Sequence, residues 1–225
     1  TFLRPPKLFE TASLRRSFGR AAKAYAHVAV LQREVETRLL EQLDFLEDRQ
    51  PVRILDLGCG PGRASGAMKK RWPKAQVIAI DAALPMLKEV PKHTRFWRPI
   101  QRVCADVSQL PVADASVDLI FSSLCLQWVN DLPATLAEFR RVLRPDGLLV
   151  FSTFGPDTLI ELREAYWQAG EKNPPLSPFA AIQQIGDAMM AAGFKNPVLD
   201  RELYRLTYSD VRTLMKELQT IGATD

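Results

Sequence analysis

The sequence predicts an α/β fold built on a doubly wound, mostly parallel sheet. Short strand-like apolar runs recur along residues 52–151, and helix-like segments separate most of them. This alternation is typical of a parallel sheet covered by helices. The first run, 52–57, passes directly into three glycines at alternate positions and then into a helix-like segment, 63–72. Because glycine has no Cβ, backbone amides in such a turn can approach a ligand closely.

Length and composition indicate one substantial domain, which we place at residues 1–225. The chain has 225 residues, of which 47% are hydrophobic and 25% are charged, as in ordinary globular proteins. Its apolar runs are too short to span a membrane, and residues 1–7 lack a signal-peptide core. The first residue is Thr1, so we expect a chain trimmed at its start. The net charge of +4 suits an anionic partner or a solvated basic face.

Cysteine and histidine usage argues against a disulfide framework or a metal site. Cys59, Cys104 and Cys125 show no Cys-x-x-Cys spacing, so we expect buried, reduced thiols in a cytoplasmic protein. His27 and His93 lack the spacing of metal ligands. We therefore expect no bound metal.

Two helices precede the first strand and form a predicted N-terminal lid, 13–48. Apolar residues recur at helical spacing in 14–25 and again in 28–46. One interpretation is that both helices simply cover the sheet. The other is that residues 18–25 close over the glycine turn and place Tyr25 beside a bound ligand.

The predicted core, 52–155, contains four further strands. They occupy 76–80, 102–105, 117–122 and 147–151, and the first two end at Asp81 and Asp106. A helix is expected over 132–143, followed by a turn at 144–147.

After the core we expect a helical cap, 156–195. It contains helices at 158–167 and 182–192, the second closed by Gly193. A strand is predicted at 199–208, and Ser209 with Asp210 indicates the N-cap of a final helix, 211–218.

The glycine spacing selects among nucleotide sites. A dinucleotide fingerprint would need glycine at Arg63, and the Gly-Lys-Ser/Thr sequence of a P-loop is missing. The pattern Asp56-x-Gly58-x-Gly60-x-Gly62 instead resembles motif I of class I S-adenosylmethionine-dependent methyltransferases, which have a Rossmann-like fold. Ligands of such sheets lie at the carboxyl ends of the strands, where strand order reverses.

This resemblance implies a set of cofactor-binding residues. Asp81 would accept hydrogen bonds from the ribose hydroxyls, and Asp106 with the Val107 backbone would hold the adenine edge. Carboxylates also suit a sulfonium cation. The implied set is Asp56, Gly58, Cys59, Gly60, Asp81, Ala82, Met86, Asp106, Val107 and Ser122.

The flanking segments resemble the malonyl-[acyl-carrier protein] O-methyltransferase family of biotin synthesis. The similar stretches are Phe18-Gly19-Arg20-Ala21-Ala22-x-x-Tyr25 with Leu31-Gln32, Ser122-x-Leu124-x-Leu126-Gln127-Trp128, Phe151-Ser152-Thr153-Phe154 with Thr158-Leu159-x-Glu161-Leu162-Arg163, and Leu218-x-x-Ile221-Gly222-Ala223-Thr224. Together they extend over nearly all of 14–225. Members of that family continue to a last antiparallel strand, so we expect one beyond residue 225.

The resemblance implies methyl transfer from S-adenosylmethionine to the free carboxylate of a malonyl thioester on acyl-carrier protein. The methyl ester would hide a charged end, so that fatty-acid enzymes could extend the chain toward pimelate. Because a carboxylate is already ionised at neutral pH, no general base is needed. The candidate catalytic residues are Tyr25, which would position the substrates, and Trp128, which would line the acyl pocket. The third candidate is Arg163, which would bind the substrate carboxylate; Arg16 and Arg20 are alternatives to Arg163.

The resemblance also implies an acidic carrier protein as partner, and we expect a monomer that binds no membrane. The candidate docking cations are Arg15, Arg16, Lys92, Arg95, Arg98 and Arg102. Phe96 and Trp97 lie among them, as aromatics do in nucleic-acid binders. However, Ser122-Ser123-Leu124-Cys125 replaces the Asn/Asp-Pro-Pro-Tyr motif of base methyltransferases, so we expect no nucleic-acid substrate.

Two alternatives remain open. The acceptor could be another small carboxylate or a quinone precursor. Alternatively, 122–163 and 177–194 resemble a respiratory complex I assembly factor that keeps the cofactor fold, a group that includes arginine hydroxylases. The 18–25 signature and the 221–224 stretch favour the biotin enzyme.

Overall fold

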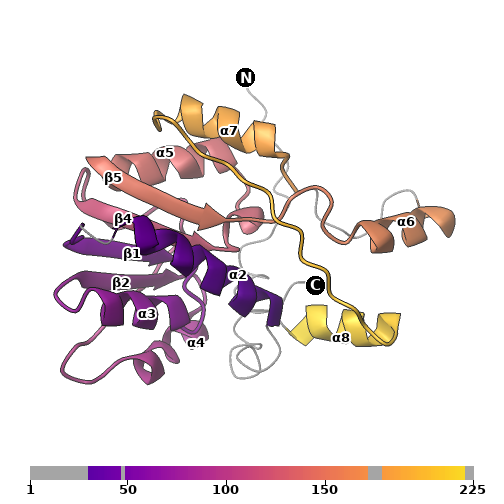
Figure 1. The fold of residues 1–225 in the computed structure, drawn as a ribbon, viewed down its shortest axis with the longest axis horizontal. Coiled ribbons are helices and arrows are strands. Elements are labelled where there is room, and N and C mark those ends of the chain that lie inside the picture. The colour runs from indigo at the N-terminus through magenta and orange to yellow at the C-terminus, as the bar shows by residue number, and fades with distance from the viewer. Residues whose placement is uncertain (1–29, 47–48, 172–178, 221–225) are drawn as a thin grey trace.

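A computed structural model describes residues 30–46, 49–171 and 179–220 of the chain (Figure 1). The strands are β1 (Arg53–Leu57), β2 (Gln76–Asp81), β3 (Gln101–Cys104), β4 (Val117–Ser123) and β5 (Leu143–Ser152). The α-helices are α2 (Val30–Glu41), α3 (Arg63–Arg71), α4 (Leu84–Leu87), α5 (Leu132–Val142), α6 (Ile160–Gln168), α7 (Ile182–Ala191) and α8 (Val211–Thr220). Short 3₁₀ helices are η1 (Gln42–Leu46), η2 (Val90–His93) and η3 (Leu126–Trp128).

The five strands form one parallel sheet in the order β3-β2-β1-β4-β5. The chain winds outward from β1 to β3 and then returns to β4 on the other side of β1. Strand order therefore reverses between β1 and β4, the position at which such sheets bind ligands. The predicted α/β, doubly wound fold is confirmed.

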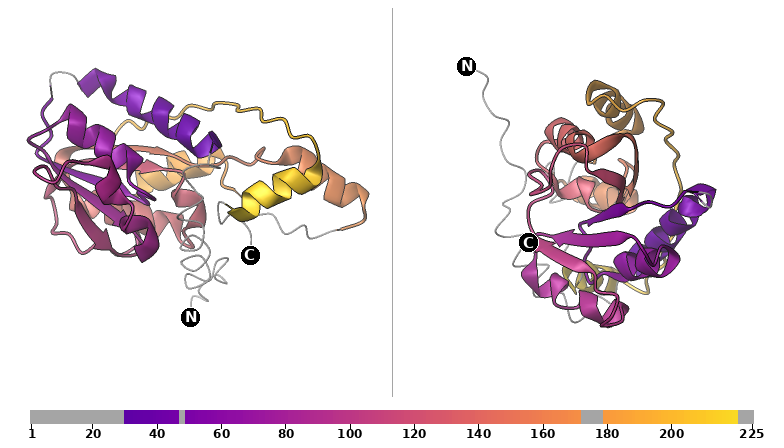
Figure 2. Two further views of the ribbon diagram at one scale, coloured as in Figure 1. Left: turned by 90° about the horizontal axis from the view of Figure 1, so that it is seen from below. Right: turned by 90° about the vertical axis from the view of Figure 1, so that its left-hand side faces the viewer.

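Helices cover both faces of the sheet (Figures 1 and 2). On one face, residues of η1 and α3 pack with Ile54 in a first core cluster. On the other, residues of α5 and α7 pack with Leu55 and Leu57 in a second cluster. Successive side chains of a strand point to opposite faces, so β1 serves both clusters and is buried throughout its length after Arg53.

The predicted turn at 144–147 is part of β5. That strand begins at Leu143, directly after α5. Val117 of β4 pairs with Leu143, whereas Leu119 pairs with Leu148, so several residues of β5 fall between two of β4. The Pro145-Asp146-Gly147 signal thus marks an irregularity in the strand pairing.

The predicted cap, 156–195, divides into two different parts. The helix α6 has no buried residue and extends beyond the carboxyl ends of the strands (Figure 1). By contrast, α7 packs Ile185 and Met189 into the second core cluster. It therefore belongs to the layer that covers the sheet.

The prediction of a strand at 199–208 is wrong. This segment is extended, but it pairs with no strand of the described residues and runs beside α2 toward α8 (Figure 1). Side chains hold it there, because Arg38 of α2 forms an ion pair with Glu202 at 2.6 Å and lies over the ring of Tyr204. A strand needs a hydrogen-bonding neighbour, and local sequence does not supply one.

Of two smaller predictions, one is confirmed and the other is partly wrong. Asp210 caps α8 as expected, since its Oδ1 accepts a hydrogen bond from the Thr213 amide at 2.8 Å. The three cysteines are free, but only Cys59 is buried, while Cys125 is half-buried and Cys104 is exposed. The expectation of three buried thiols is thus wrong for Cys104, which lies on β3 at the edge of the sheet. Among the described residues no helix is long and apolar enough to cross a membrane.

Candidate active site

The glycine turn joins β1 to α3 and is held by the neighbouring strand. The amides of Gly58 and Cys59 both donate to the Ile80 carbonyl, at 2.9 and 3.1 Å. Gly58, Gly60 and Gly62 all have positive φ, at 67°, 52° and 88°. A Cβ on Gly58 would lie 2.5 Å from the Sγ of Cys125, whereas one on Gly60 would meet nothing within 4 Å. The turn therefore packs closely on one side and leaves open space at Gly60.

Asp81 closes β2 beside this turn. Its Oδ2 accepts a hydrogen bond from the Gly60 amide at 2.9 Å, and its Oδ1 accepts one from the Ala83 amide at 2.7 Å. Burial raises the pKa of Asp81 to about 6, against the lowering effect of these two amides. Each carboxylate oxygen keeps a further lone pair. Asp81 can thus hold the turn and still accept hydroxyl donors. Met86 of α4 is buried nearby in sequence, and Ala82 is half-buried.

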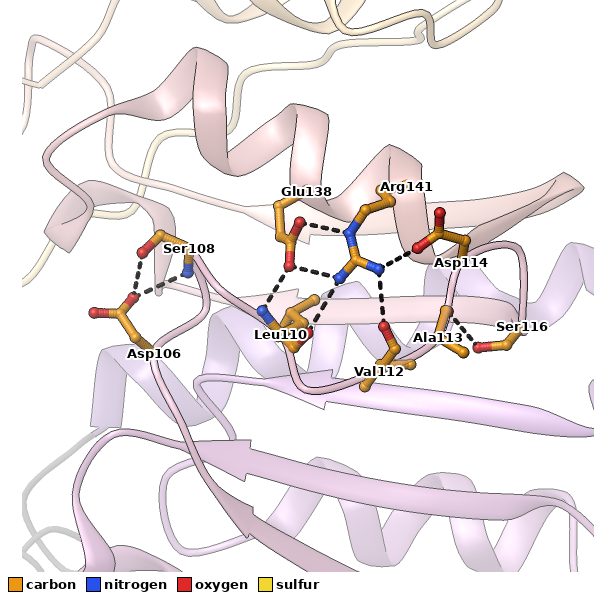
Figure 3. Close-up of polar contacts among 9 residues, drawn as sticks. All are labelled: Asp106, Ser108, Leu110, Val112, Ala113, Asp114, Ser116, Glu138 and Arg141. Carbon is orange, nitrogen blue, oxygen red and sulfur yellow. Dashed lines mark hydrogen bonds and ion pairs between the residues drawn. The ribbon is translucent and has the colours of Figure 1, made fainter.

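Asp106 follows β3 on a loop that is anchored to α5 (Figure 3). Its Oδ1 accepts hydrogen bonds from the amide and hydroxyl of Ser108, at 2.9 and 2.7 Å, and its other oxygen contacts none of the residues drawn. Val107 is buried against the second core cluster.

The anchor of this loop is Arg141 of α5. Its guanidinium donates to the carbonyls of Leu110 and Val112, at 3.1 and 2.9 Å, and pairs with Asp114 and Glu138. Glu138 in turn accepts a hydrogen bond from the Leu110 amide at 2.6 Å. Five residues of α5 and the loop are therefore tied together, which fixes the loop on which Asp106 lies.

Asp56 is enclosed beneath the glycine turn. It is 2% exposed, and the hydroxyl of Ser65 in α3 donates to its Oδ2 at 2.5 Å. Burial raises the pKa of Asp56 to about 7, and the nearby charge of Glu36 raises it further, while Ser65 lowers it. A cation bound above the turn would favour the ionised carboxylate.

Ser122 and Cys59 contact the backbone where β1 passes into the turn. The hydroxyl of Ser122, which is fully buried, donates to the Leu57 carbonyl at 3.0 Å, so it fastens β4 to the end of β1. The Sγ of Cys59 lies 3.5 Å from the Gly60 carbonyl. Burial raises the pKa of the Cys59 thiol well above its usual value, which keeps it uncharged.

The three candidate catalytic residues lie in different places. Tyr25 is outside the described residues, as are Arg16 and Arg20. Trp128 ends η3, just after β4, and is half-buried. Arg163 is on α6, where its Nη1 donates to the Pro156 carbonyl at 3.1 Å. Their assigned roles stay predictions.

Sequence reasoning did not single out Ser65, Glu138 or Arg141. The Glu138–Arg141 pair has the i, i+3 spacing of helical neighbours, which was a usable signal. Its contacts to residues 110–114 lie 27–31 positions away in the chain and leave no local pattern.

The site suits S-adenosylmethionine. Its polar side chains are carboxylates at the ends of β1, β2 and β3, which can accept hydrogen bonds from hydroxyl and amino groups and favour a sulfonium. The open space at Gly60 lets a ligand reach the backbone. Among the described residues no group of three or more His, Cys, Asp or Glu side chains could hold a metal. Fold and site together define a class I S-adenosylmethionine-dependent methyltransferase.

Comparison with known proteins agrees with this class and also identifies the family within it. Residues 55–151 match the family model described as "Methyltransferase domain". The chain is 60% identical to the malonyl-[acyl-carrier protein] O-methyltransferase of Xylella fastidiosa (strain M23), over 97% of this chain and 74% of that protein. It is 46% identical to the enzyme of the same name from Methylovorus sp. (strain MP688), over 96% of this chain and 74% of that protein. The chain belongs to the malonyl-[acyl-carrier protein] O-methyltransferase family.

Solved structures support the fold. A S-adenosylmethionine-dependent methyltransferase of Thermotoga maritima, described as a possible histamine N-methyltransferase, superposes with a TM-score of 0.61 at 20% identity, over 81% of this chain and 82% of that one. Phosphoethanolamine N-methyltransferase 2 of Haemonchus contortus, solved with S-adenosyl-L-methionine, gives 0.58 at 19% identity, over 72% of this chain and 36% of that one.

Proposed function

We propose that this protein transfers the methyl group of S-adenosylmethionine to the free carboxylate of a malonyl thioester carried on acyl-carrier protein. The observation that carries the proposal is the 60% identity, over 97% of this chain, to a relative named for that activity. The product is a methyl ester, whose apolar end lets fatty-acid enzymes extend the chain toward pimelate for biotin. The three free thiols fit a cytoplasmic location, where thiols stay reduced.

This reaction requires the protein to position the two substrates and does not require it to transfer a proton. When bound, the cofactor supplies an electrophilic methyl group on a sulfonium. The acceptor carboxylate, with a pKa of about 4, is already ionised at neutral pH, so no side chain has to remove a proton. Asp56 and Asp81 favour the positive charge, and the glycine turn orients the cofactor. The remaining requirement is to align the acceptor oxygen and exclude water.

We assign that requirement to Tyr25, Trp128 and Arg163. Trp128 follows the carboxyl end of β4, next to the position where strand order reverses. Arg163 is on α6, which extends beyond the carboxyl ends of the strands (Figure 1). An aromatic side chain can pack against the acyl thioester, and a guanidinium can hold its carboxylate.

The carrier protein would contact the basic segment 61–105. This segment contains ten Lys and Arg but only two Asp and Glu, so its formal charge is +8, and the rest of the chain carries −4. Phe96 and Trp97 lie within it, 88% and 57% exposed, with Arg95 over the Trp97 ring. These residues connect η2, whose Val90 lies against Gly62, to the amino end of β3. They would hold the body of the carrier protein, while its arm enters at the carboxyl ends of the strands.

The test is methylation of purified malonyl-acyl-carrier protein, followed by mass spectrometry of the carrier-bound acyl group. We expect a product heavier by one methylene, dependent on S-adenosylmethionine and lost when the ester is hydrolysed. The variant Asp81→Ala, which loses a cofactor contact, is the matched control and should give little product. Absence of a mass shift on malonyl and glutaryl thioesters, both free and carrier-bound, would refute the proposal.

A further inference from the structure

Two buried side-chain oxygens of α2, the Oε1 of Gln32 and the Oε1 of Glu36, accept no hydrogen bond from the residues that the structure describes. The Glu36 oxygen is paired with the Arg63 guanidinium at 2.6 Å, so the Gln32 oxygen is the one left without a described partner. An unpaired buried amide oxygen is costly, so in native proteins such an atom usually has a partner, which can be a ligand. Gln32 also belongs to the stretch that resembles the family's N-terminal signature, and nothing in the proposed mechanism uses it.

Arg63 brings this part of α2 against the glycine turn. Arg63 is the first residue of α3 and directly follows Gly62. Its Nη2 donates to the Arg33 carbonyl at 2.9 Å and to the Thr37 hydroxyl at 2.7 Å. Its Nε lies 2.6 Å from the Oε1 of Glu36. One turn of α2 is therefore clamped to the residue that ends the glycine turn.

Gln32 lies on the same side of α2 as Glu36, because residues four apart in a helix are neighbours. It is closer to the start of the helix. Since α2 leads through η1 to the beginning of β1, that start lies toward the carboxyl ends of the strands (Figure 1). The charge of Glu36 also reaches Asp56, which places this side of α2 near the methyl-donor site.

The chemistry of the cofactor selects the partner. A carbonyl oxygen needs a donor, and S-adenosylmethionine offers ribose hydroxyls, an adenine amino group and an ammonium. The ends of β2 and β3, with Asp81 and Asp106, suit the first two. The ammonium is left for the side of the glycine turn that faces α2. We propose that Gln32 binds the amino-acid part of S-adenosylmethionine through its ammonium, and that Arg63 and Glu36 are positioning residues which hold α2 for this contact.

The amide of Gln32 could also be reversed, because oxygen and nitrogen are hard to distinguish in side-chain amides. Its NH₂ would then donate to the cofactor carboxylate. Both orientations bind the same amino-acid part, so one experiment tests both.

The experiment compares two ligands by titration calorimetry of the cofactor-free enzyme. S-adenosylhomocysteine contains the amino-acid part, whereas 5′-methylthioadenosine lacks it. In Gln32→Leu we expect the dissociation constant for S-adenosylhomocysteine to rise about ten- to a hundredfold, as for loss of a hydrogen bond to a charged group. Binding of 5′-methylthioadenosine should stay unchanged. Gln32→Glu, which keeps only an acceptor, should retain most of the affinity if the amide oxygen binds the ammonium, and should lose it if the NH₂ binds the cofactor carboxylate.

Positioning by Arg63 has its own signature. Arg63→Met should show the same selective loss for S-adenosylhomocysteine, and Arg63→Lys, which keeps a donor, should partly restore affinity. The matched control is Gln183→Leu on the exposed surface of α7, for which we expect both ligands to bind as to the parent protein.

Two outcomes would overturn the inference. Equal weakening of both ligands in Gln32→Leu would mean that Gln32 only supports the fold. Unchanged binding of both would mean that water, not the cofactor, satisfies its amide. Since neither measurement needs an acceptor substrate, the result is independent of whether malonyl-acyl-carrier protein is methylated.

Discussion

Asp56 shows how much of the site depends on a single enclosed carboxylate. The sequence indicated its position at the end of the first strand and a role in cofactor binding. The structure adds that the residue is out of contact with solvent and that its one side-chain hydrogen bond comes from Ser65. The nearby charges of Glu36 and Asp81 both raise the pKa of Asp56 and so favour its neutral form.

A dependence of stability on pH follows. In the unfolded chain Asp56 ionises near 3.8, whereas burial raises its pKa in the folded protein to about 7. The folded state thus binds the proton more tightly than the unfolded state does. The resulting contribution to the unfolding free energy is complete below pH 4 and is lost as pH rises through about 7. For a difference of roughly three pKa units the loss is about 4 kcal/mol of unfolding free energy.

Urea unfolding of the cofactor-free protein at pH 5 and pH 8 measures this effect. Asp56→Asn, which cannot ionise, should have a smaller difference between the two pH values than the parent protein. Saturating S-adenosylhomocysteine should also reduce the difference, because its ammonium favours the ionised carboxylate. Identical pH profiles of parent and variant would show that Asp56 is ionised in the folded protein throughout.

Ser122 shows what the structure adds to a residue that the resemblance singles out. The implied cofactor contact stays a prediction, while the hydroxyl is buried within the sheet and donates to the Leu57 carbonyl. Its contribution is to fix the end of β1, from which the glycine turn starts. A motif can indicate that a residue matters without indicating which atom it contacts.

At the scale of elements, the loop 106–116 is a rigid part of the site because α5 holds it. Three backbone groups of that loop and one carboxylate are bonded to Arg141 or Glu138. Burying backbone groups without such partners would be unfavourable. The side chains of α5 therefore complete the hydrogen bonding of a segment that has no regular structure of its own.

Arg141→Met should loosen this loop. We expect the unfolding free energy to fall by about 1–3 kcal/mol, since several hydrogen bonds are lost but the guanidinium is partly exposed. The amide proton of Leu110 should exchange faster, and S-adenosylhomocysteine should bind several-fold more weakly. Chemical unfolding, hydrogen exchange and calorimetry measure the three effects. The exposed Arg205 offers the control Arg205→Met, and equal exchange of Leu110 in both variants would contradict the role given to Arg141.

The elements themselves were largely predictable. Strands β1, β2 and β4 and helices α3, α5, α7 and α8 begin and end within two residues of the predicted bounds, because apolar periodicity and glycine signals are local. The segment 199–208 was not predictable in this way, since a strand exists only where another strand pairs with it. The division of 156–195 also depends on a distant partner, the face of α5 that α7 covers.

At the scale of the whole molecule, charge is unevenly distributed. The segment 61–105 has a formal charge of +8 within a chain of +4, and it forms α3, α4, η2 and the strands β2 and β3. Such a separation creates a field that attracts an acidic partner and orients its approach.

Reversing charge in this segment should weaken the use of carrier-bound substrate selectively. For Arg95→Glu combined with Arg98→Glu we expect the KM for malonyl-acyl-carrier protein to rise at least about tenfold. The KM for malonyl-coenzyme A and kcat for both substrates should change little. The effect should shrink as salt is raised, because exposed charges are screened.

Steady-state kinetics at two salt concentrations provides the test. Arg201→Glu with Arg205→Glu, which lie outside the basic segment, is the matched control for the change in net charge. Similar KM values for parent and variant would exclude this docking surface. Loss of binding to RNA or to anionic vesicles, with carrier-protein kinetics intact, would assign the surface to another class of partner.

The sequence by itself determined the succession of strands and helices along the chain and the position of the glycine turn. It also determined the three acidic residues at the ends of successive strands and the methyl donor that they imply. These features are local, because a turn or a strand end is specified by neighbouring residues. Only the tertiary structure decided which residues distant in sequence come into contact around this site. Arg63 contacts α2, Arg141 contacts the loop after β3, and Ser122 contacts the end of β1. Contacts between residues some 26–65 positions apart depend on how the layers pack, and no local pattern records that packing.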